Sequence, residues 1–68
     1  METEAAAYCR LFKAALVFTH SREDVEDLWR INAETRRRYD LTEVHVADLV
    51  QSVRQHLETL RKREIRGA

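Results

Sequence analysis

The 68-residue sequence contains no proline, and its single glycine, Gly67, stands one residue from the end. The interior of the chain therefore lacks the two residues that break helices most strongly. Charged residues make up 35% of the sequence, which suits the outer surface of a small helical bundle. The composition predicts an all-α fold, and we expect one helical domain over residues 1–68.

Cysteine is almost as scarce, because Cys9 is the only one. A disulfide within the chain is thus excluded, and the sequence has no CxxC or HxxxH pair of the kind that holds a structural metal. A chain of this length buries only about 60% of its unfolded surface on folding, so its stability is marginal without such a staple. Association with another chain is the remaining support, and we expect no metal and no cofactor.

Long apolar runs and an excess of one charge are also missing. The apolar stretch over residues 5–18 is shorter than the roughly 20 residues of a membrane span, and it contains two cations. The residues before it are acidic where a secretory signal is basic, which predicts a cytoplasmic protein without membrane contact. Twelve acids balance twelve bases, but residues 1–34 hold seven acids and four bases, whereas residues 35–68 hold five acids and eight bases.

Helix ends have to be located from capping residues, since proline and glycine mark none. Ser21 is a good N-cap, and two acids that suit the positive start of a helix follow it. Further along, Thr42 is one candidate cap, and Asp40, with Glu43 three residues on, is another. The apolar periodicity between these points predicts three helices of an antiparallel bundle, over about residues 3–18, 22–38 and 42–64.

The clearest periodicity lies in residues 42–64. Apolar side chains recur there at spacings of 4, 3, 4 and 3, with Leu49 beside them, and form one stripe: Val46, Val50, Val53, Leu57 and Leu60. The stripe fits packing within the chain, and it also fits a coiled-coil seam with another molecule. In residues 22–38 the stripe is narrower and Trp29 is its anchor, either as a core residue or as a binding hot spot.

The helix predicted over residues 3–18 is apolar nearly all round. Twelve of the fourteen residues from Ala5 to Phe18 are apolar, and the two exceptions lie on one side. Two neighbouring helices cannot cover so wide a surface, and each large side chain left exposed forgoes about 1.5–3 kcal/mol of burial. We predict a homodimer that covers the rest through these residues: Tyr8, Leu11, Phe12, Ala15, Leu16 and Phe18.

No pattern indicates catalysis, because three short helices enclose little concave volume. Cys9 lies inside the apolar run, where burial raises the pKa of a thiol and makes it less reactive. We interpret it as a core residue. The three histidines, His20, His45 and His56, have no short spacing that suits metal ligands. The sequence therefore predicts a non-enzymatic protein with no catalytic residue and no small-molecule substrate.

Arginine is the common base, with ten arginines against two lysines. Arginine-rich helix surfaces hold phosphates, so a nucleic-acid-binding bundle is one alternative function. The two dense clusters also stand at predicted helix ends, where cations complement free carbonyl groups. The residues predicted to contact nucleic acid or a protein partner are Arg36, Arg37, Arg38, Arg61, Lys62 and Arg63.

Five features follow in order between residues 19 and 62: an acidic helix cap, Asp27-Leu28-Trp29, the arginine run, Asp40-Leu41-Thr42-Glu43 and a final amphipathic helix. This order resembles the C-terminal helical module of phage single-strand annealing proteins. The resemblance implies docking to a partner nuclease or a single-stranded-DNA-binding protein, although the annealing core of that family has no counterpart here. In size and character the chain is also similar to small phage-encoded regulators and inhibitors.

These features predict a non-enzymatic protein-interaction module that forms a homodimer. We expect it to act as a small regulator, inhibitor or adaptor by binding a larger protein or nucleoprotein complex. Two alternatives stay open, a nucleic-acid-binding bundle and a purely structural subunit that only assembles with itself.

Overall fold

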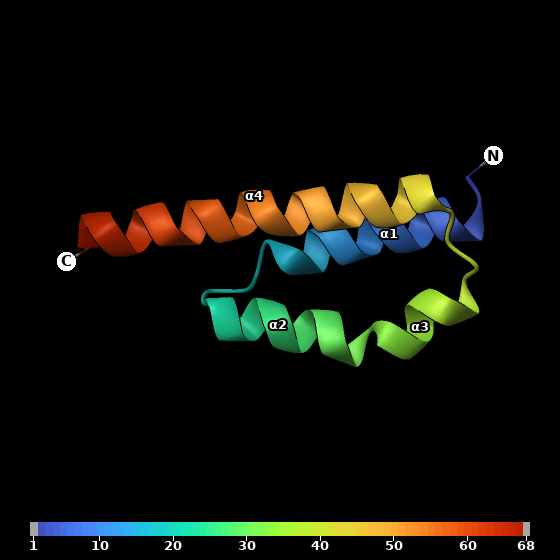
Figure 1. The fold of residues 1–68 in the computed structure, drawn as a ribbon, viewed down its shortest axis with the longest axis horizontal. Helices are drawn as coiled ribbons and strands as arrows, with labels where there is room; N and C mark the ends of the chain where they lie inside the picture. Colours follow the sequence, from blue (N-terminus) through green and yellow to red (C-terminus); the bar gives the residue numbers. More distant parts are fainter. Residues whose placement is uncertain (1, 68) are drawn as a thin grey trace.

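The computed structural model describes the backbone of residues 2–67 and the side chains of residues 2–65. It contains helices and turns, with no strand in this part of the chain, so the predicted all-α fold is confirmed (Figure 1). The four helices are α1 (Glu4–Leu16), α2 (Arg22–Ile31), α3 (Ala33–Arg38) and α4 (Glu43–Gly67).

Hydroxyl side chains cap the starts of the three longer helices. Thr3 accepts a hydrogen bond of 3.1 Å from the backbone amide of Ala6 at the start of α1, and Ser21 accepts one of 3.1 Å at the start of α2, as predicted. At the start of α4, Thr42 Oγ1 accepts from the His45 amide at 3.3 Å. Asp40 is not the cap, because it has a positive φ of 52° and lies in the preceding turn.

The single helix predicted over residues 22–38 is wrong, because two helices meet at Asn32. This residue has φ −86° and ψ 0°, outside the helical region. Its Nδ2 donates a 2.9 Å hydrogen bond to the carbonyl oxygen of Leu28, and its Oδ1 accepts a 3.1 Å hydrogen bond from the Tyr8 hydroxyl. Asparagine side chains that bond locally compete with helical backbone bonding. The hydrogen bond to Tyr8 on α1 keeps the Asn32 side chain in the orientation that interrupts the helix.

The chain reverses direction twice along its length. In Figure 1, α1 and α4 lie side by side and run the same way, and α2 with α3 runs back between them in sequence. The molecule is elongated, with principal extents of 43 × 21 × 18 Å, because α4 continues past the end of α1. Within the described residues, no helix combines the length and the apolar character that crossing a bilayer demands.

The core consists of two small clusters of buried side chains. Toward the start of α1, Tyr8, Cys9 and Phe12 pack against Leu49 of α4. Toward the end of α1, a second cluster contains Leu16, Val25 and Leu60. The core is therefore thin, and α1 contributes to both halves of it.

The buried side of α4 is rotated away from the stripe predicted by its spacing. Leu49, predicted to lie beside the stripe, is completely buried, whereas Val46, predicted to lie in it, is 38% exposed. Half-buried Val53 and buried Leu60 continue the line that starts at Leu49. The reason is that α1 packs on the Leu49 side of α4, which makes that residue the centre of the contact.

Candidate protein interface

Half of the residues predicted for self-association lie in the core. Tyr8, Phe12 and Leu16 are spaced four apart, so they share one side of α1, and none of them is more than 8% exposed. Tyr8 and Phe12 pack with Leu49, and Leu16 packs with Val25. Their assignment to an outward surface was wrong, because composition alone did not identify the side of α1 that meets α4.

The opposite side of α1 forms an apolar surface that we call the outer α1 face: Ala7, Leu11, Ala14, Ala15 and Phe18. Residues 7, 11, 14 and 18 recur at spacings of 4, 3 and 4, which places them on one side of a helix. Leu11 is 61% exposed and Phe18 is 76% exposed. The three alanines beside them have short side chains, so the Leu11 and Phe18 side chains project from the face.

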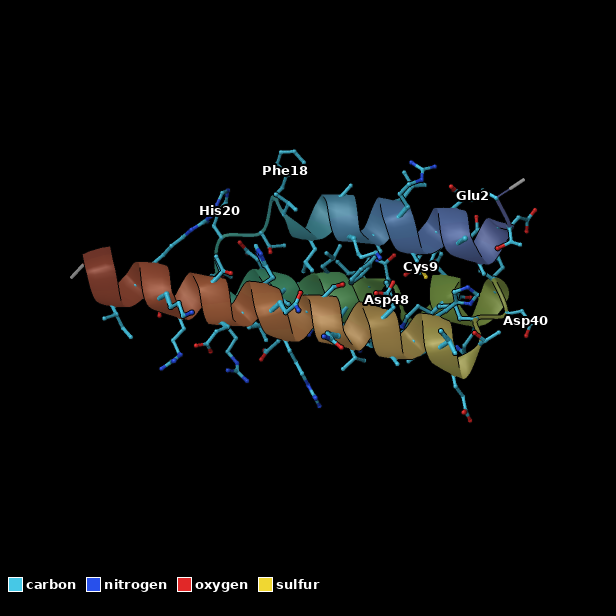
Figure 2. The ribbon with its side chains drawn as sticks, turned by 90° about the horizontal axis from the view of Figure 1, so that it is seen from above. Glu2, Cys9, Phe18, His20, Asp40 and Asp48 are labelled. Atoms are coloured by element: carbon cyan, nitrogen blue, oxygen red, sulfur yellow. The ribbon has the colours of Figure 1, made fainter. Side chains whose placement is uncertain are left out.

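The two basic side chains of α1 are both paired with carboxylates, and Arg10 lies at the edge of this face, four residues before Ala14. Lys13 Nζ lies 2.7 Å from the Asp48 carboxylate on α4, and Arg10 lies 3.1 Å from the Glu2 carboxylate. Both pairs are solvent-exposed and contribute little stability by themselves. Figure 2 shows Phe18 pointing away from the body of the protein at the end of α1. The outer α1 face is thus apolar and open.

A hollow opens beside Ala7 at the other end of this face. It has a volume of about 190 Å³ and is lined by Glu4, Ala7, Tyr8, Leu11 and Tyr39. The rings of Tyr8 and Tyr39 stack with centroids 5.5 Å apart at an interplanar angle of 21°. The hollow exists because Ala7 has only a methyl group beside these two rings.

A second apolar surface lies between α2 and α4, and we call it the α2–α4 groove: Val25, Trp29, Val50, Val53 and Leu57. It encloses about 370 Å³, and its rim carries Arg22, Glu26 and Arg54. Arg22 and Glu26 form an ion pair of 3.2 Å along α2. The groove uses the side of α4 that the predicted stripe had placed in the core.

Trp29 serves the core and the groove together. Its ring meets the Phe12 ring edge-on, with centroids 5.8 Å apart and an interplanar angle of 82°. The Arg36 guanidinium lies 3.8 Å from the centroid of the Trp29 ring, and Arg36 Nη1 donates a 2.6 Å hydrogen bond to the Trp29 carbonyl oxygen. Arg36 therefore joins α3 to α2 through a cation–π contact and a hydrogen bond.

The structure does not bring together the six basic residues predicted as partner contacts. Arg36 is engaged with Trp29, and Arg61 lies 2.8 Å from the Glu58 carboxylate. The other four are exposed: Arg37, Arg38, Lys62 and Arg63. The two clusters lie toward opposite ends of the molecule (Figure 1), since the helical rise from the start of α4 to Arg61 is about 27 Å. They do not form one basic patch.

Cys9 is buried in the fold, and His56 is half-buried between α4 and the turn after α1. Cys9 is 4% exposed, so its interpretation as a core residue is confirmed. Burial, and to a smaller extent the Asp48 carboxylate, raises the pKa of its thiol above the ordinary value. His56 Nε2 lies 3.1 Å from the Thr19 carbonyl oxygen, which accepts a hydrogen bond when that nitrogen carries the proton. His56 thus helps to hold the turn after α1 against α4.

Fold and surface together define a class: a small all-helical chain with a thin core, an exposed apolar helix face and a separate apolar groove. Comparisons of the sequence with family models and with curated proteins, and of the structure with solved structures, found no match. The resemblance to phage annealing modules stays a prediction.

Proposed function

We propose that this chain is a non-enzymatic protein-interaction module that forms a homodimer through the outer α1 face. The observation that carries the proposal is the exposure of the two large apolar side chains of this face, Leu11 at 61% and Phe18 at 76%. Burying each of them against a second copy is worth about 1.5–3 kcal/mol. This is a large share of the stability of a domain with so few buried side chains.

The thin core supports the same proposal. Among the described residues, seven hydrophobic side chains are buried, and only Leu49 and Val25 are less than 2% exposed. A chain of this size without a disulfide gains stability from association. We propose that dimerisation completes the three-helix unit, in which α2 and α3 together run antiparallel to the adjacent helices α1 and α4.

The α2–α4 groove and the charged surface would remain available to bind a larger protein or nucleoprotein complex, on which the dimer would act as a regulator, inhibitor or adaptor. The outer α1 face and the groove share no residue, so one surface does not compete with the other. Direct nucleic-acid binding receives less support, because the two arginine clusters lie apart and one arginine of each is already paired.

The test is the mass of the protein in solution, measured by sedimentation equilibrium over a range of concentrations. We expect the wild type to be a dimer and Leu11→Glu to be a monomer with unchanged helicity, because Leu11 lies outside the core. Val44→Glu is the matched control: Val44 is 78% exposed on α4, away from α1, and its replacement should leave the dimer intact. A wild type that stays monomeric at millimolar concentration, with full helicity, contradicts the proposal.

A further inference from the structure

We propose that the two copies pair with their α1 helices antiparallel, and that Phe18 of each copy fills the hollow beside Ala7 of the other. The inference rests on the proposed self-association and specifies its geometry. A projecting ring and a hollow lie toward opposite ends of one apolar helix face. A surface with both features complements itself when a second copy is turned end to end.

The hollow suits an aromatic ring in size and in lining. It measures about 190 Å³, and an apolar cavity of about 150 Å³ is large enough to bind benzene. Tyr8 and Tyr39 line it, and Leu11 borders it on the outer α1 face. Aromatic walls favour a third ring in an offset or edge-on orientation. The side chain that α1 presents for this position is Phe18, whose ring points away from its own chain (Figure 2).

Phe18 belongs to the helical face although α1 ends two residues earlier. Its amide donates a 3.1 Å hydrogen bond to the Ala15 carbonyl oxygen, so the backbone continues to turn in the helical sense. Side chains three residues apart lie in line in such a 3₁₀-type turn, so Phe18 stays over Ala15 on the outer α1 face. The resulting order along the face is small, large, small, large: Ala7, Leu11, Ala14 and Phe18.

This order determines the register of the pair. If Phe18 lies opposite Ala7 of the other copy, the numbers of facing residues add up to 25, and Leu11 then lies opposite Ala14. Each layer formed by residues 7, 11, 14 and 18 contains one large and one small side chain, an arrangement that packs two facing helices without voids, and Ala15 lies opposite Arg10 at the edge. In parallel pairing Phe18 would meet Phe18 and Ala7 would meet Ala7, so one layer would be overfilled and another empty. The antiparallel pair is isologous and closes at two copies.

Disulfide trapping tests this register. In a Cys9→Ala background, the variants Ala7→Cys and Phe18→Cys are prepared separately and exposed to a mild oxidant alone and as a mixture. We expect a covalent dimer mainly in the mixture. There the cysteine at position 7 of one chain faces the cysteine at position 18 of the other, and Phe18 of the first chain still faces Ala7 of the second. Alone, each variant separates its two cysteines by eleven residues of helix, about 16 Å, which exceeds the roughly 7 Å that a disulfide spans.

A mixture of Ala7→Cys with Val44→Cys is the control, because Val44 is as exposed as Phe18 but lies on α4. It should give no covalent dimer above the level of either variant alone. Efficient cross-linking of Ala7→Cys with itself would establish parallel pairing and overturn the inference. Absence of cross-linking in the mixture, with the wild type dimeric by sedimentation, would overturn it as well. A monomeric wild type would instead refute the proposed self-association.

Discussion

Replacing Asn32 by alanine removes both side-chain hydrogen bonds that hold the break between α2 and α3. The bonds to the Tyr8 hydroxyl and to the Leu28 carbonyl oxygen each contribute about 0.5–1.5 kcal/mol. The Leu28 oxygen keeps a 3.2 Å hydrogen bond from the backbone amide of residue 32, so losing the side-chain bond to Leu28 costs less than losing the bond to Tyr8. We expect a net loss of about 1–2 kcal/mol.

The bond to Tyr8 can be isolated by a double-mutant cycle with Tyr8→Phe, measured by urea unfolding followed by circular dichroism. The cycle is best made in the Leu11→Glu background, where unfolding does not depend on the dimer. The coupling energy between the two positions should be about 0.5–1.5 kcal/mol. Asn32→Asp, which keeps an acceptor for the Tyr8 hydroxyl but loses the donor to Leu28, should retain most of this coupling. A coupling energy near zero would show that the bond does not hold α1 to the break.

Two further predictions concern the core cluster around Leu49. Leu49→Ala, at a fully buried position, should cost about 2–5 kcal/mol and remove most of the helical signal at 25 °C, whereas Val44→Ala should change the unfolding free energy little. Burial raises the pKa of Cys9 above its ordinary value of 9.0, so the thiol ionises at a lower pH in the unfolded chain than in the folded one. Ionisation therefore favours the unfolded chain, and the melting temperature should stay constant below pH 9 and fall above it. Cys9→Ala should lessen that fall, and an equal fall in both proteins would contradict the assignment.

The sequence was sufficient to predict the helices that depend on local signals. Absence of interior proline and glycine predicted the all-α class, and Ser21 marked the start of α2 correctly. The break at Asn32 was not predictable in the same way. Asparagine is tolerated inside many helices, and here its effect depends on the Tyr8 hydroxyl, which comes from 24 residues away. A local pattern carries no information about that partner.

The candidate interface was also predictable only in part from the sequence. Spacing alone places Tyr8, Phe12 and Leu16 on one side of α1 and Leu11 with Phe18 on the other. It does not tell which side α4 covers, because both sides are apolar. The exposed side carries more alanine than the buried one, and this asymmetry was present in the sequence. This asymmetry favoured packing the larger side chains inward. Phe18 is the exception, a large side chain on the exposed side, and the proposed pairing depends on it.

Placing core and interface on opposite sides of α1 couples folding to association. Every core cluster includes a residue of α1, so a force that holds α1 in place also holds the two clusters together. A partner that binds only the folded chain stabilises it by about 2.7 kcal/mol when its concentration is 100 times the dissociation constant. That gain is comparable to the cost of truncating one core side chain. For a chain with two small clusters and no covalent staple, the second copy would therefore add stability to a monomer that already folds, and assembly would raise the free energy of unfolding.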